Sequence, residues 1–220
     1  MEFAVLGWPT EGPQLRLDYR RFAYAGKFVT SNTGKAVVRA ADSESEDPEA
    51  AGDSAIDPAE FHTDVLAAIA FNADRTDDAT LWYRYVTVRD DARGEGLGPR
   101  LAAFVAPRAA ERGYERLRIA VNNPFAYEAM YKAGFAWTGR ETGIAELVLE
   151  RPAAPERAAN RDRTPSRYRA GLDRYRARDP DDPEASFLAS REDADPPALL
   201  PFDDLAVDAE EPPSGVDPEG

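Results

Sequence analysis

The segment from Val88 to Gly98 has the residue types and spacing best suited to hold an anion. Gly94, Gly96 and Gly98 stand at alternate positions between an apolar run and a segment of helical spacing. Glycine lets the backbone turn sharply, and the free amides at a helix start add donors, so successive N–H groups can line one concavity. Arg93 adds a fixed positive charge. The segment therefore predicts a binding site for a diphosphate.

Two common phosphate-binding motifs do not fit this segment. The dinucleotide-binding fingerprint Gly-x-Gly-x-x-Gly would need a third glycine where the chain has Pro99. The Walker motif needs a glycine five residues before Gly34-Lys35, and Val29 occupies that position. The remaining pattern is Arg-x-x-Gly-x-Gly, entered from a strand.

A second segment, from Leu117 to Phe135, follows at a plausible distance. It reads as a strand, then an N-cap at Asn123, a helix that begins at Pro124, and a C-cap at Gly134. Together the two segments, within about residues 81–150, resemble the acetyl-CoA-binding blocks of the GNAT acetyltransferase superfamily. In that family the glycine loop is followed by a strand, a tyrosine-bearing helix and Gly-Phe.

The resemblance implies an α/β fold with a mixed, mostly antiparallel central sheet flanked by helices. It implies an acyl-CoA-dependent N-acyltransferase that uses acetyl-CoA as co-substrate and no metal. An amine acceptor would attack the thioester directly in a ternary complex. The acceptor stays open among a protein amino group, an amino acid and a small polyamine.

The resemblance also implies roles for individual residues. Backbone amides of the loop hold the pyrophosphate in the family, and the preceding strand pairs with the pantetheine amides. The expected cofactor-binding residues are therefore Val86, Thr87, Val88, Arg93, Gly94, Glu95, Gly96, Leu97 and Gly98. The tyrosine of the second block commonly protonates the departing thiolate, which implies a catalytic role for Tyr131.

The chain departs from the family pattern near the second block. Counted back from Tyr131, Pro124 stands where the family usually has a cofactor-contacting asparagine. Asn122 and Asn123 are adjacent and join the expected cofactor-binding residues, although Asn123 could equally serve only as the helix cap.

The strand at 81–88 lacks the acidic residue that often serves the family as general base. A water chain, or one of Glu60, Asp64 and His62, could accept the amine proton, and the base stays open. The missing acid leaves a rival hypothesis, a non-catalytic acyl-CoA-binding or sensor module.

Apolar patterning places these motifs on a series of elements. A helix is expected at 96–112, kinked by Pro107 and ended by Gly113. A second helix is expected at 124–133, and 15–28 should be a helix or an irregular clamp. Strands are expected at 1–8, 35–40, 65–71, 81–88, 117–121, 135–138 and 144–149.

The formal net charge of −14 is concentrated in two stretches. Residues 41–60 carry eight acidic side chains and no basic one, and residues 179–220 carry fourteen against Arg191 alone. Low hydrophobicity with high like charge cannot offset the entropy of ordering. We therefore expect an acidic surface loop at 41–60 and a disordered acidic tail at 179–220, beside a folded domain at 1–152.

Residues 153–178 are expected to form an Arg-rich helical extension, with seven arginines within 161–178. Tyr168, Leu172 and Tyr175 fall at spacings of four and three, which predicts one apolar helix face. The arginines could hold an anionic ligand or RNA. We favour a surface helix that docks by its tyrosines.

The composition excludes several classes of protein. The chain has no cysteine and a single histidine, which excludes disulfides, thiolate metal sites and multi-histidine metal sites. No apolar run approaches the roughly 18 residues of a membrane span, so we expect a cytoplasmic protein without a membrane partner. Nucleic acid is not an expected partner, and a homodimer stays open. The acid-rich, lysine-poor composition resembles that of proteins from salt-accumulating microbes and implies a halophilic origin.

Overall fold

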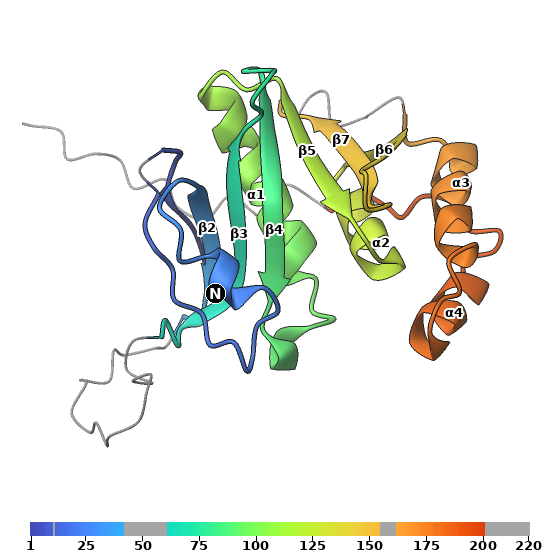
Figure 1. The fold of residues 1–220 in the computed structure, drawn as a ribbon, viewed down its shortest axis with the longest axis horizontal. Helices are drawn as coiled ribbons and strands as arrows, with labels where there is room; N and C mark the ends of the chain where they lie inside the picture. Colours follow the sequence, from blue (N-terminus) through green and yellow to red (C-terminus); the bar gives the residue numbers. More distant parts are fainter. Residues whose placement is uncertain (11, 42–60, 155–161, 201–220) are drawn as a thin grey trace, which may run out of the picture.

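The computed structural model describes residues 1–10, 12–41, 61–154 and 162–200. Seven strands form one sheet in the order β1-β2-β3-β4-β5-β7-β6, antiparallel except for the parallel pair β4 and β5 (Figure 1). The strands are β1 (Glu2–Gly7), β2 (Gly34–Arg39), β3 (Val65–Ala73), β4 (Thr80–Val88), β5 (Arg116–Val121), β6 (Ala136–Glu141) and β7 (Leu147–Pro152). The α-helices are α1 (Leu97–Glu111), α2 (Pro124–Lys132), α3 (Pro165–Arg176) and α4 (Asp182–Ala189). The predicted mixed α/β fold is confirmed.

The helix ends follow from the residues identified in the sequence. The Asn123 side chain accepts a hydrogen bond from the backbone N–H of Ala126 at 2.8 Å, and Pro124 opens α2. Gly113 and Gly134, just beyond the C-caps of α1 and α2, have φ angles of 87° and 91°. Only glycine adopts this left-handed backbone at little cost, so both helices stop there.

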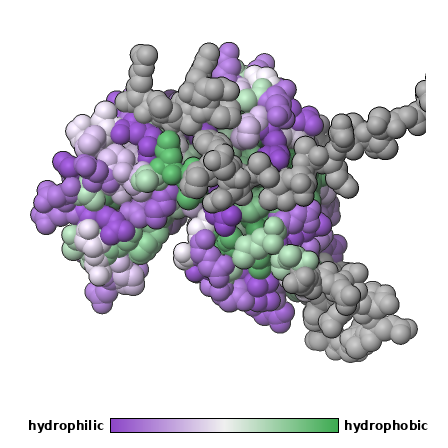
Figure 2. Space-filling view, turned by 180° about the vertical axis from the view of Figure 1, so that it is seen from behind, coloured by the Kyte–Doolittle hydropathy of each residue, from purple (hydrophilic) through white to green (hydrophobic). Residues whose placement is uncertain are grey.

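The sheet buries a different set of side chains on each face. Helices α1 and α2 pack on one face, where Leu81, Leu101 and Phe104 belong to the larger core. On the other face, segment 12–33 buries Leu15 and Phe28 against β2 and β3. This segment is irregular apart from a short 3-10 helix, so of the two structures expected for 15–28 the irregular one is present. The surface seen from behind is largely hydrophilic, with hydrophobic residues in a few small areas (Figure 2).

Helix α3 of the Arg-rich extension docks by its apolar face. Tyr168, Leu172 and Tyr175 are at most 2% exposed. Gly171 approaches α2 so closely that a Cβ atom there would lie 2.0 Å from the Tyr127 hydroxyl. The tyrosines therefore hold α3 against α2, in the manner favoured from the sequence.

The structure differs from the sequence-based expectation over residues 179–200. Part of the expected tail forms α4, whose Leu188 is 2% exposed in the core. Arg191 pairs with Glu128 at 2.7 Å, and Asp195 pairs with Arg169 at 2.9 Å. Apolar contacts and specific ion pairs thus hold a segment whose average composition favours disorder. Residues 201–220, and positions 42–60 of the expected acidic loop, lie outside the described residues.

Candidate functional site

Strands β4 and β5 pair only at one end and then separate. Parallel pairing runs from Thr80 opposite Arg116 to Tyr83 opposite Ile119, whereas β4 continues to Val88. The register between β4 and β3 shifts at this point, because Ala70 pairs with Tyr85 while Phe71 pairs with Tyr83. Arg84 is therefore the extra residue of a β-bulge, which bends its strand. The result is an opening between β4 and β5 in which one edge of β4 is unpaired (Figure 1).

The predicted diphosphate loop joins β4 to α1. Gly94 and Gly96 have φ angles of 87° and 76°, in the left-handed region that favours glycine. Gly96 is also the N-cap of α1, so the amides of Leu97 and Gly98 begin the helix and need acceptors from outside it. Amides at this end suit an anion because the helix dipole adds a partial positive charge.

The charged side chains of the loop lie at its surface. Arg93 pairs with Asp90 at 2.5 Å, and the two side chains are 58% and 53% exposed. The backbone of the loop therefore presents donors without help from a buried charge. Glu95 is exposed as well.

The three expected β4 residues face both sides of the sheet. Val86 and Val88 pack towards α1, where a Cβ at Gly98 would lie 3.4 Å from Val88 Cγ2. Thr87 faces the other way, and its hydroxyl donates to the carbonyl of Ala23 at 2.8 Å. Because these side chains are engaged in packing, the backbone edge of β4 is the part left to bind a ligand. This edge and the loop amides fit the amide chain and diphosphate of a CoA thioester.

The two asparagines after β5 are occupied mainly with each other and with α2. Asn123 caps α2, and its side-chain amide donates to Asn122 Oδ1 at 3.0 Å. Asn122 is exposed. The capping role of Asn123 is thus present in the structure, while the cofactor role of both residues stays a prediction.

Tyr131 lies in a buried cluster of tyrosines that contains Tyr127 and Tyr168. Its hydroxyl accepts hydrogen bonds from the Trp137 backbone N–H at 3.1 Å and from the Tyr127 hydroxyl at 3.2 Å. Trp137 is on β6, the edge strand beyond β7, and Tyr168 of α3 packs against the rings of Tyr127 and Tyr131. Burial raises the pKa of Tyr131. The hydroxyl is therefore bonded on the β6 side of α2, and its catalytic role stays a prediction.

Two of the residues considered as general base, Asp64 and His62, lie near the end of β4 that leads into the loop. Asp64 pairs with Arg39 at 3.2 Å, and His62 Nδ1 lies 3.2 Å from the backbone nitrogen of Arg16. His62 lines a small pocket together with Arg89, which directly follows β4. Glu60 lies outside the described residues. Neither Asp64 nor His62 is at the β-bulge, and the base stays open.

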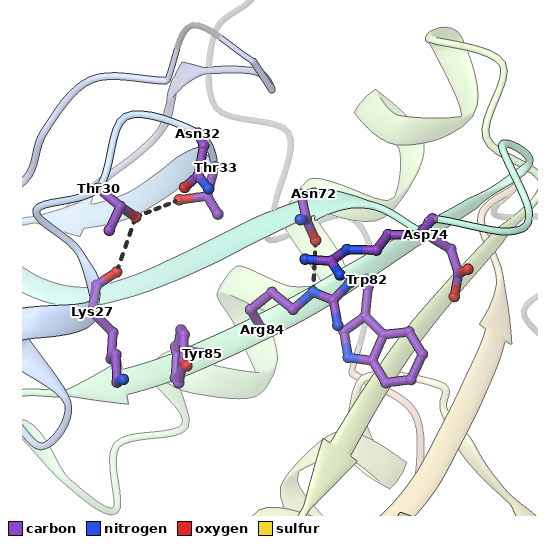
Figure 3. A pocket seen from close by; sticks show the side chains of 10 residues that line it. Lys27, Thr30, Asn32, Thr33, Asn72, Asp74, Trp82, Arg84 and Tyr85 are labelled. Atoms are coloured by element: carbon purple, nitrogen blue, oxygen red, sulfur yellow. Dashed lines mark hydrogen bonds between the residues drawn. The ribbon is translucent and has the colours of Figure 1, made fainter.

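A pocket of about 600 Å³ lies beside the β-bulge on the sheet face opposite α1 (Figure 3). Trp82, Arg84 and Tyr85 of β4 form its floor, with residues of β3 and of segment 27–33 around them. Sequence reasoning missed this pocket, because its walls are distant in the chain. The one available signal was the polar and aromatic run Trp82–Tyr85 within a strand expected to be buried.

Two features are absent from the part of the chain that the structure describes. No group of three or more His, Cys, Asp or Glu side chains is placed to hold a metal ion there. None of the helices found there has the length and apolar character needed to span a membrane.

Comparison with known proteins gives a family match. A model of the acetyltransferase (GNAT) family matches residues 18–135, which include β4, the glycine loop and α2. No curated protein matches the chain.

The chain is similar to several solved structures. A nourseothricin acetyltransferase is 22% identical, over 41% of this chain and 59% of that one, with a TM-score of 0.38. A Bacillus subtilis acetyltransferase in complex with CoA is 14% identical, over 54% and 75%, with a TM-score of 0.39. A ribosomal-protein-alanine N-acetyltransferase from Brucella melitensis is 16% identical, over 55% and 68%, with a TM-score of 0.39. The chain thus spans less than two thirds of the first of these, and none of them informs the choice of acceptor.

Proposed function

Since the chain belongs to the acetyltransferase (GNAT) family, we propose that it is an N-acetyltransferase that takes its acetyl group from acetyl-CoA and passes it to an amine in a ternary complex. The observation that carries this proposal is the opening between β4 and β5 with the glycine loop at its end. A thioester ligand can pair with the free edge of β4 while its diphosphate meets the amides of the loop.

The reaction requires positioning more than reactive side chains. Acetyl-CoA would supply the thioester: the amine nitrogen forms a bond to the carbonyl carbon, the carbon–sulfur bond breaks, the amine loses a proton and the thiolate gains one. The unpaired β4 backbone between Arg84 and Val88 would orient the carbonyl and polarise it with an amide. The amides at 93–98 would hold the diphosphate.

Calorimetric titration with acetyl-CoA tests the binding half of this proposal. Gly96→Val should weaken binding at least tenfold, because the left-handed backbone costs a residue with a Cβ about 1–2 kcal/mol and the loop must shift to relieve it. Gly139→Val is the matched control, since Gly139 has a φ of 84° and open space around its Cβ position, but lies in β6. An unchanged affinity in Gly96→Val, or no binding by the unaltered protein, would overturn the proposal.

Turnover separates the enzyme from the rival binding module. CoA release in the presence of an amine panel supports the enzyme, and saturable binding without any turnover supports a non-catalytic acyl-CoA module.

The proton donor is tested in the same assay with Tyr131→Phe. A donor role predicts a fall in turnover of about 100-fold or more, with acetyl-CoA affinity unchanged. Because the hydroxyl lies against β6 under α3, we expect turnover to stay within about threefold.

A further inference from the structure

The pocket beside the β-bulge is placed where an acceptor would have to enter. Its floor residues Arg84 and Tyr85 are the first residues of β4 beyond the last pair with β5. The pocket lies on the face opposite α1, so an amine bound here approaches the opening from the side away from the helix. Its volume of about 600 Å³ is in the range of small-molecule sites.

The pocket carries an excess of positive charge. Lys27, Arg75 and Arg84 line it, and none of them forms an ion pair with any described residue. Asp74 is the one carboxylate in its lining, and it is already bonded to Arg118 at 2.8 Å and to the backbone N–H of Thr76 at 2.9 Å. The pocket thus has three cations without an ion-pair partner among the described residues, and its one carboxylate is already bonded.

Arg84 is fixed in a geometry that leaves its two terminal nitrogens available. Its Nε donates to Asn72 Oδ1 at 2.6 Å, and its guanidinium lies over the Trp82 ring, 4.7 Å from the centroid (Figure 3). No hydrogen bond links the terminal nitrogens to the part of the chain described. Burial lowers the pKa of Arg84, the nearby Asp74 carboxylate partly offsets this shift, and Arg75 and Arg118 add to it. Asp74 is the one carboxylate in the lining that acts on this guanidinium, and it forms its ion pair with Arg118 instead.

Lys27 stands on the opposite side of the pocket, near Tyr85 (Figure 3). Its ammonium lies 5.9 Å from the centroid of the Tyr85 ring. An anion between Lys27 and Arg84 would therefore meet positive charge on two sides. A polycation such as a polyamine would meet repulsion instead.

We infer that this pocket binds the carboxylate of the acceptor, so that the amine acceptors are small amino acids. The two terminal nitrogens of Arg84 would hold the two carboxylate oxygens side by side. Lys27 and Arg75 would add charge, and Trp82 would form the apolar wall for the acceptor's side chain. This inference rests on the proposed acetyl transfer.

The decisive comparison is between amines that differ only in the carboxylate. The free α-amino acids and their α-amides are assayed in pairs for acetyl-CoA-dependent CoA release. We expect at least one amino acid to be preferred over its amide about 10- to 100-fold in kcat/KM, as a charged hydrogen-bonded pair is worth about 1.5–3 kcal/mol. Equal rates within all pairs, or a preference for spermidine, would overturn the inference. A preference for phosphoethanolamine over every amino acid would overturn the carboxylate as the recognised anion.

Variants make the test specific to the pocket. Arg84→Gln should bring the amino acid/amide ratio close to one, and Lys27→Gln, an exposed position, should lower it severalfold. Arg112→Gln removes the same charge at the end of α1, where Arg112 lies over Trp8, and should leave the ratio unchanged. The ratio of the two kcat/KM values does not depend on the fraction of folded protein. A loss of stability in Arg84→Gln therefore leaves the comparison valid.

Tryptophan fluorescence gives a readout that does not depend on turnover. Titration with the preferred amino acid, or with its N-acetyl product, should change the emission of Trp82, and Trp82→Phe should abolish the response. Failure of acetyl-CoA to bind would contradict the proposed function itself. Acetyl-CoA binding with turnover of uncharged amines alone would contradict only the carboxylate pocket.

Discussion

Arginine is prominent in two regions of this molecule, and the two regions use it differently. In the Arg-rich extension, every described arginine between 163 and 178 has a partner within the protein. Arg174 and Arg178 bond to Glu141, Arg169 bonds to Asp195, and Arg163 donates to the Pro197 carbonyl. In the pocket beside the β-bulge, Lys27, Arg75 and Arg84 have no ion-pair partner among described residues.

The density of arginine along the chain therefore does not identify an anion site. Seven arginines within 161–178 are a conspicuous signal, yet the described ones bind carboxylates and carbonyls of neighbouring elements. The pocket combines cations from three separate segments and has its single carboxylate already engaged. What matters for a ligand is the charge that remains after the protein's own pairs are formed.

The largest expected effect comes from undocking the extension. Gly171→Ala would place a Cβ 2.0 Å from the Tyr127 hydroxyl, which the packed tyrosines cannot accommodate without moving α3. We expect the free energy of unfolding to fall by about 3 kcal/mol, at the upper end for overpacking. Urea denaturation measures this free energy. Ala170→Leu, at the exposed neighbouring position, is the control and should lie within about 0.5 kcal/mol of the unaltered protein. A loss below about 1 kcal/mol in Gly171→Ala would contradict the docked geometry.

A smaller effect is expected from Lys35, a buried cation that supports the wall of the pocket. Its ammonium is fully buried and donates to the carbonyls of Thr30 and Thr33 and to the Thr33 hydroxyl, without a carboxylate. Burial lowers the pKa of Lys35 to about 8, from 10.5. Between these values the unfolded chain binds more protons than the folded protein, so stability should rise with pH.

The expected gain from Lys35 is at most about 1.4 kcal/mol per pH unit between pH 8 and 10. Above pH 10 the tyrosines act in the opposite direction, because burial raises the pKa of Tyr83 and Tyr175 and the unfolded chain loses their protons first. Urea denaturation of the unaltered protein and of Lys35→Met across this range isolates the lysine. If both proteins show the same pH profile, the lysine is not the source of the change.

The fold and the loop could be predicted from the sequence because local patterns determine them. Compact apolar runs place β3 and β4, and Asn123, Gly113 and Gly134 set the ends of α2 and α1. The left-handed backbone at Gly94 and Gly96 is one that glycine permits at little cost. Each of these features depends on a few consecutive residues.

The pocket and the position of Tyr131 could not be predicted, because both depend on contacts between distant segments. Arg84 becomes a pocket residue through a bulge relative to β3 and a hydrogen bond to Asn72. Tyr131 is turned towards β6 and covered by α3, which begins more than thirty residues later. The order within 179–200 depends in the same way on Glu128, which no local average of charge reveals.

The weakest effect is expected from Arg174, an arginine of the extension that can be compared directly with Arg84 of the pocket. Arg174 pairs with Glu141 at 2.5 Å, but the arginine side chain is 56% exposed, so water and salt screen the pair. Arg174→Gln should lower the free energy of unfolding by no more than about 1 kcal/mol and leave the amino acid/amide ratio of kcat/KM unchanged. Arg84→Gln, which makes the same change of side chain in the pocket, should bring this ratio close to one. If Arg174→Gln altered the ratio as much as Arg84→Gln, the extension would contribute to acceptor binding. Charge without an ion-pair partner inside the protein would then no longer distinguish the two regions.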